Sequence, residues 1–228
     1  MKPDSRAAIA ELLGTFIFCF VGAGSICMNQ WSGGSVGLLG IALAHGTALA
    51  VMISALGHLS GGHFNPAVTF GLLAINKIDS RRASAYIVAQ LIGAAAAGFL
   101  LRLVVPPEAW HPVHLGTPTL GIGISPAQAM VMEVVLTFAL MLTVCGTAID
   151  PKGSWQSVAG FGIGAVLVFS ILVAGPITGA ALNPARVFGP ALASGTWDHH
   201  LIYWLGPLSG AVIAAFLYGR IFLGLRGR

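Results

Sequence analysis

The tripeptide Asn-Pro-Ala occurs twice in the chain, as Asn65-Pro66-Ala67 and as Asn183-Pro184-Ala185. Asparagine is a strong N-cap and proline is favoured in the first turn, so each copy predicts the start of a helix. The first turn of a helix carries unpaired N–H groups and the positive end of a dipole, and the asparagine side chain adds amide donors. If the two starts meet, their fixed donors can bind a neutral polar molecule.

Backbone carbonyls that precede each tripeptide are the acceptors that would complement these donors. Both tripeptides follow segments of small residues, in which an irregular backbone leaves carbonyls without a helical partner. The residues concerned are Gly61, Gly62 and His63 before the first copy and Gly179, Ala180 and Ala181 before the second. Central donors with acceptors on both sides suit water and small neutral solutes, and the dipole ends oppose cations, protons included.

The composition places these residues in a membrane. Hydrophobic residues make up 56% of the 228 residues and charged residues only 8%, against about 25% charged residues in a soluble domain. The 11 basic residues are spread along the chain and form no phosphate-binding stripe, which excludes nucleic acid as a partner. Cys19, Cys27 and Cys145 lie in apolar runs, which excludes a disulfide framework.

The hydrophobic pattern predicts six spanning helices and two short ones. Residues 12–76 contain no Asp, Glu, Lys or Arg, and as one helix they would be about 97 Å long against a hydrocarbon core of about 30 Å. The chain must therefore fold back within this stretch. We expect spans at about 8–28, 36–57, 83–105, 128–148, 157–176 and 201–222, with short re-entrant segments at about 65–76 and 183–193.

Basic residues set the expected orientation of these spans. An even number of crossings puts both chain ends on one side, and the side rich in Lys and Arg is cytoplasmic. The basic residues expected on the side of the chain ends are Lys2, Arg6, Lys77, Arg81, Arg82, Lys152, Arg220, Arg226 and Arg228, against Arg102 on the opposite side. Both ends are therefore expected in the cytoplasm, and the two short segments enter from opposite sides.

The two halves of the chain resemble each other. Three patterns recur in the same order and at nearly constant spacing: Glu11 to Phe16 as Glu133 to Phe138, the Asn-Pro-Ala tripeptide, and Tyr86, Gln90 and Gly93 as Tyr203, Pro207 and Gly210. An odd number of spans in each half inverts the second copy, an architecture that places a site at the midplane between the repeats. We predict one domain over residues 1–228, with internal inverted repeats at about 1–105 and 125–228.

Three ionisable side chains lie in otherwise apolar sequence, namely Glu11, Glu133 and Arg186. A charge within a membrane is costly unless partners satisfy it, so each is a candidate functional residue. Arg186 follows Asn183 by one turn and therefore shares its helix face. The alternative is that these side chains extend from helix ends to the membrane surface.

The paired motif Gly61-Gly62-His63-Phe64-Asn65-Pro66-Ala67-Val68-Thr69 and Asn183-Pro184-Ala185-Arg186, with Glu11 and Glu133, resembles the aquaporin (major intrinsic protein) family over essentially the whole chain. The resemblance implies an all-α membrane protein with six transmembrane helices, two re-entrant half-helices and an inverted repeat. It implies a homotetramer in the lipid bilayer with one pore per subunit, no enzymatic activity, and no metal or cofactor. In this family the two glutamates support the loops by accepting from their backbone. We expect a bacterial-type member in the inner (plasma) membrane.

The constriction of that family, carried over residue by residue, falls on His45, Ile171, Ala180 and Arg186. Typical water-selective members have Phe, His, a small residue and Arg at these four positions. His45 stands in place of the Phe and Ile171 in place of the His, so the set is more similar to that of plant vacuolar-type and ammonia-conducting members. A wider constriction is expected, in which His45 donates or accepts according to its tautomer. We expect a passive channel for water and other small neutral solutes that excludes protons and ions. The alternative is a channel mainly for ammonia, glycerol, urea or neutral metalloid hydroxides.

Three further functions can be compared with the sequence. An intramembrane serine protease needs Gly-x-Ser-Gly, whereas Gly57-His58-Leu59-Ser60-Gly61 has one residue too many, and the sixth span holds no histidine. A proton-coupled transporter needs an acid at the midplane, and Glu11 and Glu133 lie nearer to span ends. A non-conducting junction protein of the same fold is the third alternative.

Overall fold

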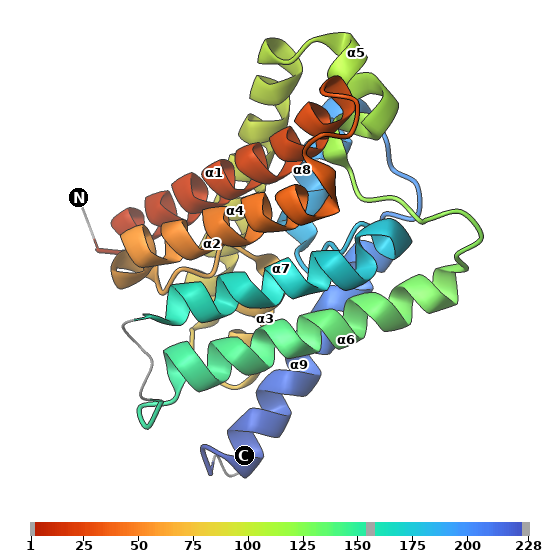
Figure 1. The fold of residues 1–228 in the computed structure, drawn as a ribbon. Helices are drawn as coiled ribbons and strands as arrows, with labels where there is room; N and C mark the ends of the chain where they lie inside the picture. Colours follow the sequence, from red (N-terminus) through yellow and green to blue (C-terminus); the bar gives the residue numbers. More distant parts are fainter. Residues whose placement is uncertain (1–2, 154–157, 225–228) are drawn as a thin grey trace.

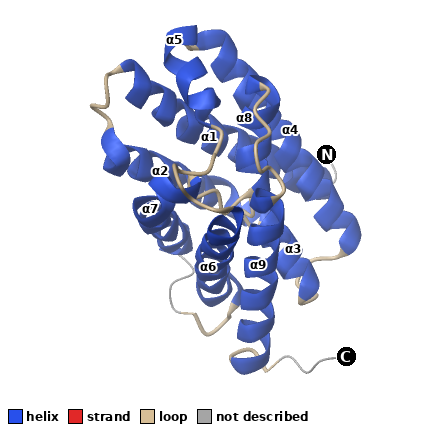
Figure 2. Ribbon diagram, turned by 90° about the vertical axis from the view of Figure 1, so that its right-hand side faces the viewer, coloured by secondary structure: helices blue, strands red, loops and turns tan. Residues whose placement is uncertain are grey.

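The computed structural model describes residues 3–153 and 158–224, and over these ranges the chain forms helices and no strands (Figure 1, Figure 2). Six helices are long and apolar enough to cross a membrane. They are α1 (Pro3–Trp31), α2 (Gly37–Ser60), α4 (Ser80–Val104), α6 (Pro126–Val144) with the π-helical turn η2 (Cys145–Ile149), α7 (Ala159–Thr178) and α9 (Ile202–Ile221). The six predicted spans are thereby confirmed, although residue 157, the expected start of the fifth, lies outside the described ranges.

Two short helices, α3 (Pro66–Ala74) and α8 (Pro184–Ser194), begin at the Asn-Pro-Ala tripeptides. Their 9 and 11 residues make helices of about 14 and 17 Å, which cannot cross a membrane. Asn65 and Asn183 are the N-caps, and each side-chain oxygen accepts a hydrogen bond from an N–H of the first turn. The local capping chemistry therefore determines where both half-helices begin.

The long helices run across the molecule between two faces. The face that holds the start of α1, the end of η2, the start of α7 and the end of α9 is called the terminal face here. The opposite face, called the loop face, carries α5 (Pro107–Trp110) and the turn η1 (His111–Gly116). In Figure 1 the starts of α1 and α7 and the end of η2 lie at the left. Lys2, Arg226 and Arg228, which were used to predict the orientation, lie outside the described residues.

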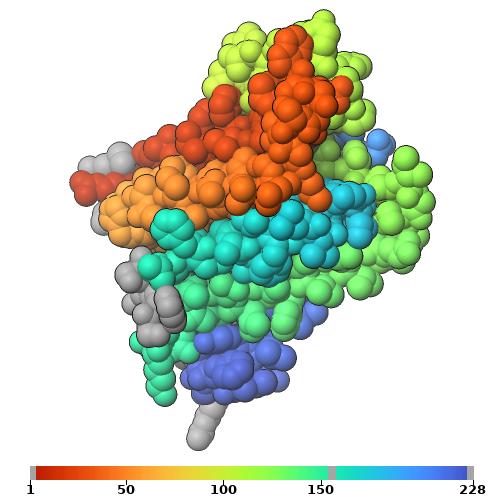
Figure 3. Space-filling view, viewed as in Figure 1, coloured from red at the N-terminus to blue at the C-terminus, as the bar shows by residue number. Residues whose placement is uncertain are grey.

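The halves of the chain interlock through their short helices. Helix α1 packs on α2 and α4, α2 packs on α7, and α6 packs on α7 and α9. Helix α3 packs mainly on α9, and α8 packs mainly on α4, so each short helix lies against a long helix of the other half. In the space-filling view α1, α2, α7 and α6 form successive bands of one face (Figure 3).

Glycines allow the closest helix pairs to form. A Cβ at Gly93 would overlap the Leu12 carbonyl where α4 crosses α1, and a Cβ at Gly210 would overlap the Val134 carbonyl where α9 crosses α6. Small residues at such crossings let the backbones of membrane helices approach and pack. The same contact therefore recurs in both halves.

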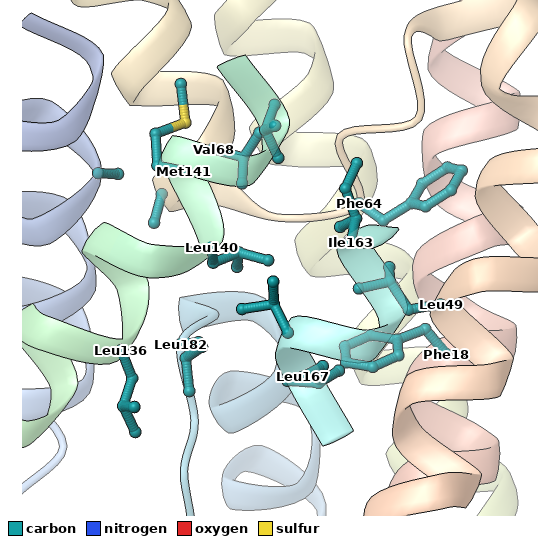
Figure 4. Close-up of a cluster of buried hydrophobic side chains, with 14 of the residues drawn as sticks. Phe18, Leu49, Phe64, Val68, Leu136, Leu140, Met141, Ile163, Leu167 and Leu182 are labelled. Carbon is teal, nitrogen blue, oxygen red and sulfur yellow. The ribbon is translucent and has the colours of Figure 1, made fainter. Parts of the chain in front are cut away.

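The core is apolar and draws on both halves. Its largest cluster includes Phe18, Leu49, Phe64, Val68, Leu136, Leu140, Met141, Ile163, Leu167 and Leu182, which come from both halves of the chain (Figure 4). Large apolar side chains also cover the outside, among them Leu103, Phe161 and Leu205. Ionisable Glu11 and Glu133 are instead fully buried. An apolar exterior around a polar interior suits a protein surrounded by lipid.

Candidate functional site

Asn65 and Asn183 join the starts of the two half-helices near the centre of the molecule. Nδ2 of Asn65 donates to the carbonyl oxygen of Leu182 (2.9 Å), and Nδ2 of Asn183 donates to the carbonyl oxygen of Phe64 (2.8 Å). Each amide nitrogen carries a second hydrogen, and both asparagines line a cavity. The asparagines can therefore offer further donors beside this cavity.

Glu11 holds the backbone of the first loop. Its Oε1 accepts from Ser60 Oγ (2.6 Å) and from the N–H of His63 (2.9 Å), and its Oε2 accepts from the N–H of Phe64 (2.6 Å) and from Gln90 Nε2 (2.8 Å). The carboxylate thus occupies the loop's inward N–H groups. The N–H groups of His63 and Phe64 therefore point towards helix α1.

Glu133 makes the corresponding contacts in the second loop. Its Oε1 accepts from Thr178 Oγ1 (2.7 Å) and from the N–H of Ala181 (3.0 Å), and its Oε2 accepts from the N–H of Leu182 (2.8 Å). Both glutamates have no exposed surface. The alternative that they extend to the membrane surface is therefore wrong.

A tyrosine hydroxyl donates a hydrogen bond to the last residue of the long helix that precedes each loop. The hydroxyl of Tyr86 donates to the carbonyl oxygen of Ser60 (2.8 Å), and the hydroxyl of Tyr203 donates to the carbonyl oxygen of Thr178 (2.9 Å). Both tyrosines are buried. Each pairs a carbonyl from the end of a helix, where intrahelical donors run out.

A cavity of about 90 Å³ extends from the asparagines towards the terminal face. Its polar lining comes from the two loops, and most of the remaining wall is apolar, with residues such as Leu49, Ile163 and Leu167. The loop residues that line it are Gly61, Gly62, His63, Asn65, Ala181, Leu182 and Asn183. Among the described residues, no three His, Cys, Asp or Glu side chains are grouped so as to hold a metal ion.

The sequence predicts six residues whose backbone carbonyls would act as acceptors. Four of them line this cavity, and Gly179 and Ala180 do not. Gly179 caps the end of α7, where a Cβ would lie 2.9 Å from the side chain of Pro118, so it belongs to the wall of the loop face. Leu182 was not among the expected residues. Its position in the second loop matches that of Phe64 in the first, which was the signal available in the repeat.

All four residues expected to form the constriction are buried. His45 and Ala180 are 1% exposed, and Ile171 and Arg186 are 3% exposed. Nη1 of Arg186 donates to the carbonyl oxygen of Gly116 (2.8 Å), and Nη2 lies 3.1 Å from Nε2 of His45. Nε of Arg186 is buried and has no hydrogen-bond partner among the described residues. The guanidinium is therefore fixed from two sides.

The hydrogen bonds of His45 determine its tautomer. Its Nδ1 lies 2.9 Å from the carbonyl oxygen of Ile41, which can only accept, so Nδ1 carries the proton. Arg186 can only donate, so Nε2 of His45 is the acceptor in their contact. Both ring nitrogens are occupied by protein groups. The expectation that His45 donates to or accepts from a solute is thus corrected: the ring positions Arg186.

Gly116 is a site residue that the sequence did not reveal. It follows His114 and Leu115, and all three have a left-handed backbone, with φ of 48°, 56° and 72° in chain order. The hydroxyl of Thr117 donates to the carbonyl oxygen of His114 (2.6 Å) and stabilises this turn. The turn directs the Gly116 carbonyl to Arg186. Backbone groups of loops leave no signal in residue type.

Comparisons with known proteins agree with this architecture. A family model described as Major intrinsic protein matches residues 2–218. Aquaporin TIP4-4 from Zea mays is 43% identical over 230 residues, which cover 97% of this chain and 88% of that protein. Probable aquaporin TIP-type alpha from Phaseolus vulgaris is 46% identical over 226 residues, which cover 95% of this chain and 85% of that protein.

Among solved structures, the aquaglyceroporin from Plasmodium falciparum is similar, with a TM-score of 0.82 and 28% sequence identity over 97% of this chain and 98% of that chain. The similar curated proteins named above come from plants. They give no support to the expectation of a bacterial-type member in a bacterial inner membrane.

Proposed function

The chain belongs to the major intrinsic protein family, and from this premise we propose that it is a passive channel for water and other small neutral solutes that excludes ions and protons. The reciprocal pairing of Asn65 and Asn183 carries this proposal. It places two helix starts and two amide groups at one point, beside a cavity that both asparagines line. A solute with hydrogen-bonding groups can exchange water for these fixed partners.

Exclusion of cations is proposed to rest on converging positive charge. The starts of α3 and α8 each carry the positive end of a helix dipole. Arg186 adds a full charge one turn beyond Asn183, and its guanidinium is buried. A cation would have to lose its hydration next to these groups, which raises its barrier more than that of a neutral solute.

Passage of solutes larger than water is proposed from the shape of the constriction. Imidazole is smaller than a benzyl ring, and Ile171 adds no polar partner. Because His45 is occupied by Arg186 and Ile41, a solute at this level meets the guanidinium on one side and apolar Ile171 and Ala180 on the other. Such a wall suits ammonia, urea, glycerol or a neutral metalloid hydroxide, which supports the alternative that one of these is the main solute.

Topology and assembly complete the proposal. We propose that the terminal face is cytoplasmic, because most of the basic residues are expected there. The recurrent glutamate, tyrosine and asparagine contacts support a single domain of two inverted repeats, at about 1–105 and 125–228. The apolar outer surface is proposed to contact lipid and three further copies of the chain in a homotetramer, as the family resemblance implies.

Stopped-flow light scattering on proteoliposomes tests this function. Vesicles with the wild-type protein, with the double variant His45→Phe and Ile171→His, and without protein are exposed in parallel to water, glycerol, urea and ammonia gradients. We expect the wild type to conduct water and at least one larger solute, and the double variant to conduct water alone. If vesicles with folded wild-type protein are no more permeable to water than lipid alone, the proposed channel function is wrong. Equal exclusion of larger solutes by both proteins would overturn the wide constriction.

A further inference from the structure

Helices α1 and α4 touch at one level and separate from there towards the terminal face. A Cβ at Gly93 would overlap the carbonyl of Leu12, so the two backbones are in contact at this level. Nearer to the two helix starts, the same helices leave a groove of about 460 Å³ between them on the outside of the molecule. The crossing at Gly93 therefore closes the groove at one end, and the other end opens at the terminal face.

The wall of this groove is apolar. It includes Ala8, Ile9 and Leu12 from α1 and Ser84, Ala85 and Val88 from α4. Ile9 is 44% and Val88 is 56% exposed, so large apolar side chains border it on both helices. The hydroxyl of Ser84 already donates its single hydrogen to the carbonyl oxygen of Ser80 (2.9 Å). The side chains of the wall thus offer contact to an apolar ligand and no free donor.

The depth of the groove matches one leaflet of a bilayer. Its wall on α4 extends from Ser84 to Ile92, a rise of about 12 Å, and half of a hydrocarbon core of about 30 Å is about 15 Å. An acyl chain from one leaflet fits this depth. A membrane helix of another copy would have to continue past the crossing, where the groove has ended.

A basic side chain lies at the open end of the groove. Arg81 precedes Ser84 and Ala85 by one helical turn, so it shares their face of α4, and it is exposed. Side chains of a helix lean towards its start, which directs this guanidinium to the level of the lipid headgroups. The other ionisable residues of the two helix starts are Arg6, Lys77 and Arg82, which are basic, and Asp4 and Asp79, which are acidic. The open end is therefore positive on balance.

The second half of the chain differs at the corresponding place. Tyr86 recurs as Tyr203, and the same spacing places Asp198 where the first half has Arg81. Asp198 is exposed just before the start of α9, towards the loop face. A carboxylate repels phosphate, whereas the planar fork of an arginine matches it. The repeat therefore provides a cationic position towards the terminal face alone.

We propose that the groove between α1 and α4 binds an anionic phospholipid, with an acyl chain against the apolar wall and the phosphate on Arg81. Basic groups beside grooves between membrane helices bind anionic headgroups in this way. The site lies on the outer surface and does not depend on the proposed transport. A lipid held there fills the space between the two helices where their backbones have separated, so its binding stabilises the folded chain.

Native mass spectrometry of the full-length protein, titrated with phosphatidylglycerol or with phosphatidylcholine of the same acyl chains, tests the headgroup. We expect the wild type to bind one phosphatidylglycerol per subunit more tightly than phosphatidylcholine. Arg81→Gln should weaken phosphatidylglycerol binding roughly fivefold, as for the loss of one basic contact, and Arg81→Lys should restore most of it. Arg220→Gln, also exposed at the terminal face but on α9, is the matched control and should bind like the wild type. Equal affinities of wild type and Arg81→Gln for phosphatidylglycerol would overturn the proposal.

Filling the groove tests the acyl chain. Ala85→Phe places a ring in the groove, and the control Ala96→Phe places one on nearly the same face of α4, three turns later and beyond the crossing. Both alanines are exposed, and unfolding midpoints without added lipid verify that both variants fold. We expect Ala85→Phe to weaken binding of both lipids and Ala96→Phe to weaken neither. Unchanged lipid binding in Ala85→Phe would overturn the proposal, and a smaller oligomer in the same spectra would then assign the groove to a contact between copies.

Discussion

In the first half-loop Glu11 accepts four hydrogen bonds, whereas in the second half-loop Glu133 accepts three. The bond that is missing from the second loop is the one from Gln90, because the matching residue on α9 is Pro207, whose side chain has no donor. The remaining contacts pair off: a hydroxyl and two backbone N–H groups in each loop. The two halves thus build the same support from different side chains.

Chemistry at the pore differs more than the support does. On the terminal side the first loop exposes His63, backed by Thr69, and the second loop has Ala181 and Val187 at the matching places. Towards the loop face the second half contributes Arg186, which is matched by an apolar valine in the first. The repeat therefore provides a symmetric frame, and single residues make its two ends chemically different, with an imidazole at one end and a guanidinium at the other.

Loss of either buried carboxylate is expected to have the largest effect. Glu11→Gln or Glu133→Gln replaces an acceptor by an amide that turns N–H groups towards the N–H groups of the loop. We expect each variant to lose about 3 kcal/mol or more of stability, and Glu11→Gln to lose more because it has the additional partner Gln90. Thermal unfolding in detergent measures the difference. Equal midpoints for both variants would show that the fourth hydrogen bond contributes nothing.

Arg186→Ala is expected to change selectivity more than stability. It removes the full charge of the constriction, so leakage of protons and cations should increase while water still passes. The control is Val68→Ala, at the matching place in the first half-helix. Proton flux into proteoliposomes with a pH-sensitive dye measures both variants. An unchanged proton leak in Arg186→Ala would assign the exclusion to the helix dipoles instead.

Gly116→Ala tests whether the left-handed turn at the end of η1 positions Arg186. Gly116 and Gly123 both have positive φ, 72° and 78°, but a Cβ at Gly116 would meet the backbone of Ala23 at 3.0 Å, whereas a Cβ at Gly123 meets nothing within 4 Å. Both alanine variants should lose about 1–2 kcal/mol from backbone strain. Only Gly116→Ala should also alter solute permeability. The same change in solute permeability in Gly123→Ala would point instead to a general loosening of the segment between η1 and α6.

The backbone of the two loops offers a smaller and reciprocal test. Gly62 and Ala180 occupy matching places and have φ of 65° and 46°, a region that costs a residue with a side chain about 1–2 kcal/mol. Gly62→Ala should therefore destabilise the first loop by about 1 kcal/mol, and Ala180→Gly should stabilise the second by less than about 1 kcal/mol, because glycine also gains freedom when unfolded. Unfolding midpoints of the two variants that shift in the same direction would contradict this.

The smallest expected effect is a pH dependence of stability that arises from His200, just before the start of α9. Nε2 of His200 accepts from Nε1 of Trp204 (3.0 Å), which requires a neutral ring, and burial lowers the pKa of His200 below its usual value of 6.5. The unfolded chain therefore binds the proton more readily, and stability should fall as the pH drops below about 6.5. His200→Gln should flatten this part of the profile. Thermal unfolding between pH 5 and 8 measures it; an identical profile in the variant would exclude His200.

The fold was predictable where its signals are local. Hydropathy and the caps Asn65 and Asn183 depend on neighbouring residues, so spans and half-helices were predicted near their observed positions. The site was predictable only in its residue types. The tautomer of His45 depends on Arg186, which lies far away in sequence, and the carbonyls of Gly116 and Leu182 depend on backbone direction. Neither is encoded in a motif, and the π-helical turn at the end of α6 was not anticipated.

The packing of α3 on α9 and of α8 on α4 has a consequence for synthesis. Helix α3 is made early, but α9, the helix on which it rests, belongs to the second half of the chain and is made much later. The first asparagine likewise finds its carbonyl partner only after Leu182 has been added. A nascent chain that has inserted only its first three spans therefore lacks the surface that covers α3 and the cavity residues that the second half contributes. Because residues of both halves line the cavity, the conduit takes shape only as the second half is added.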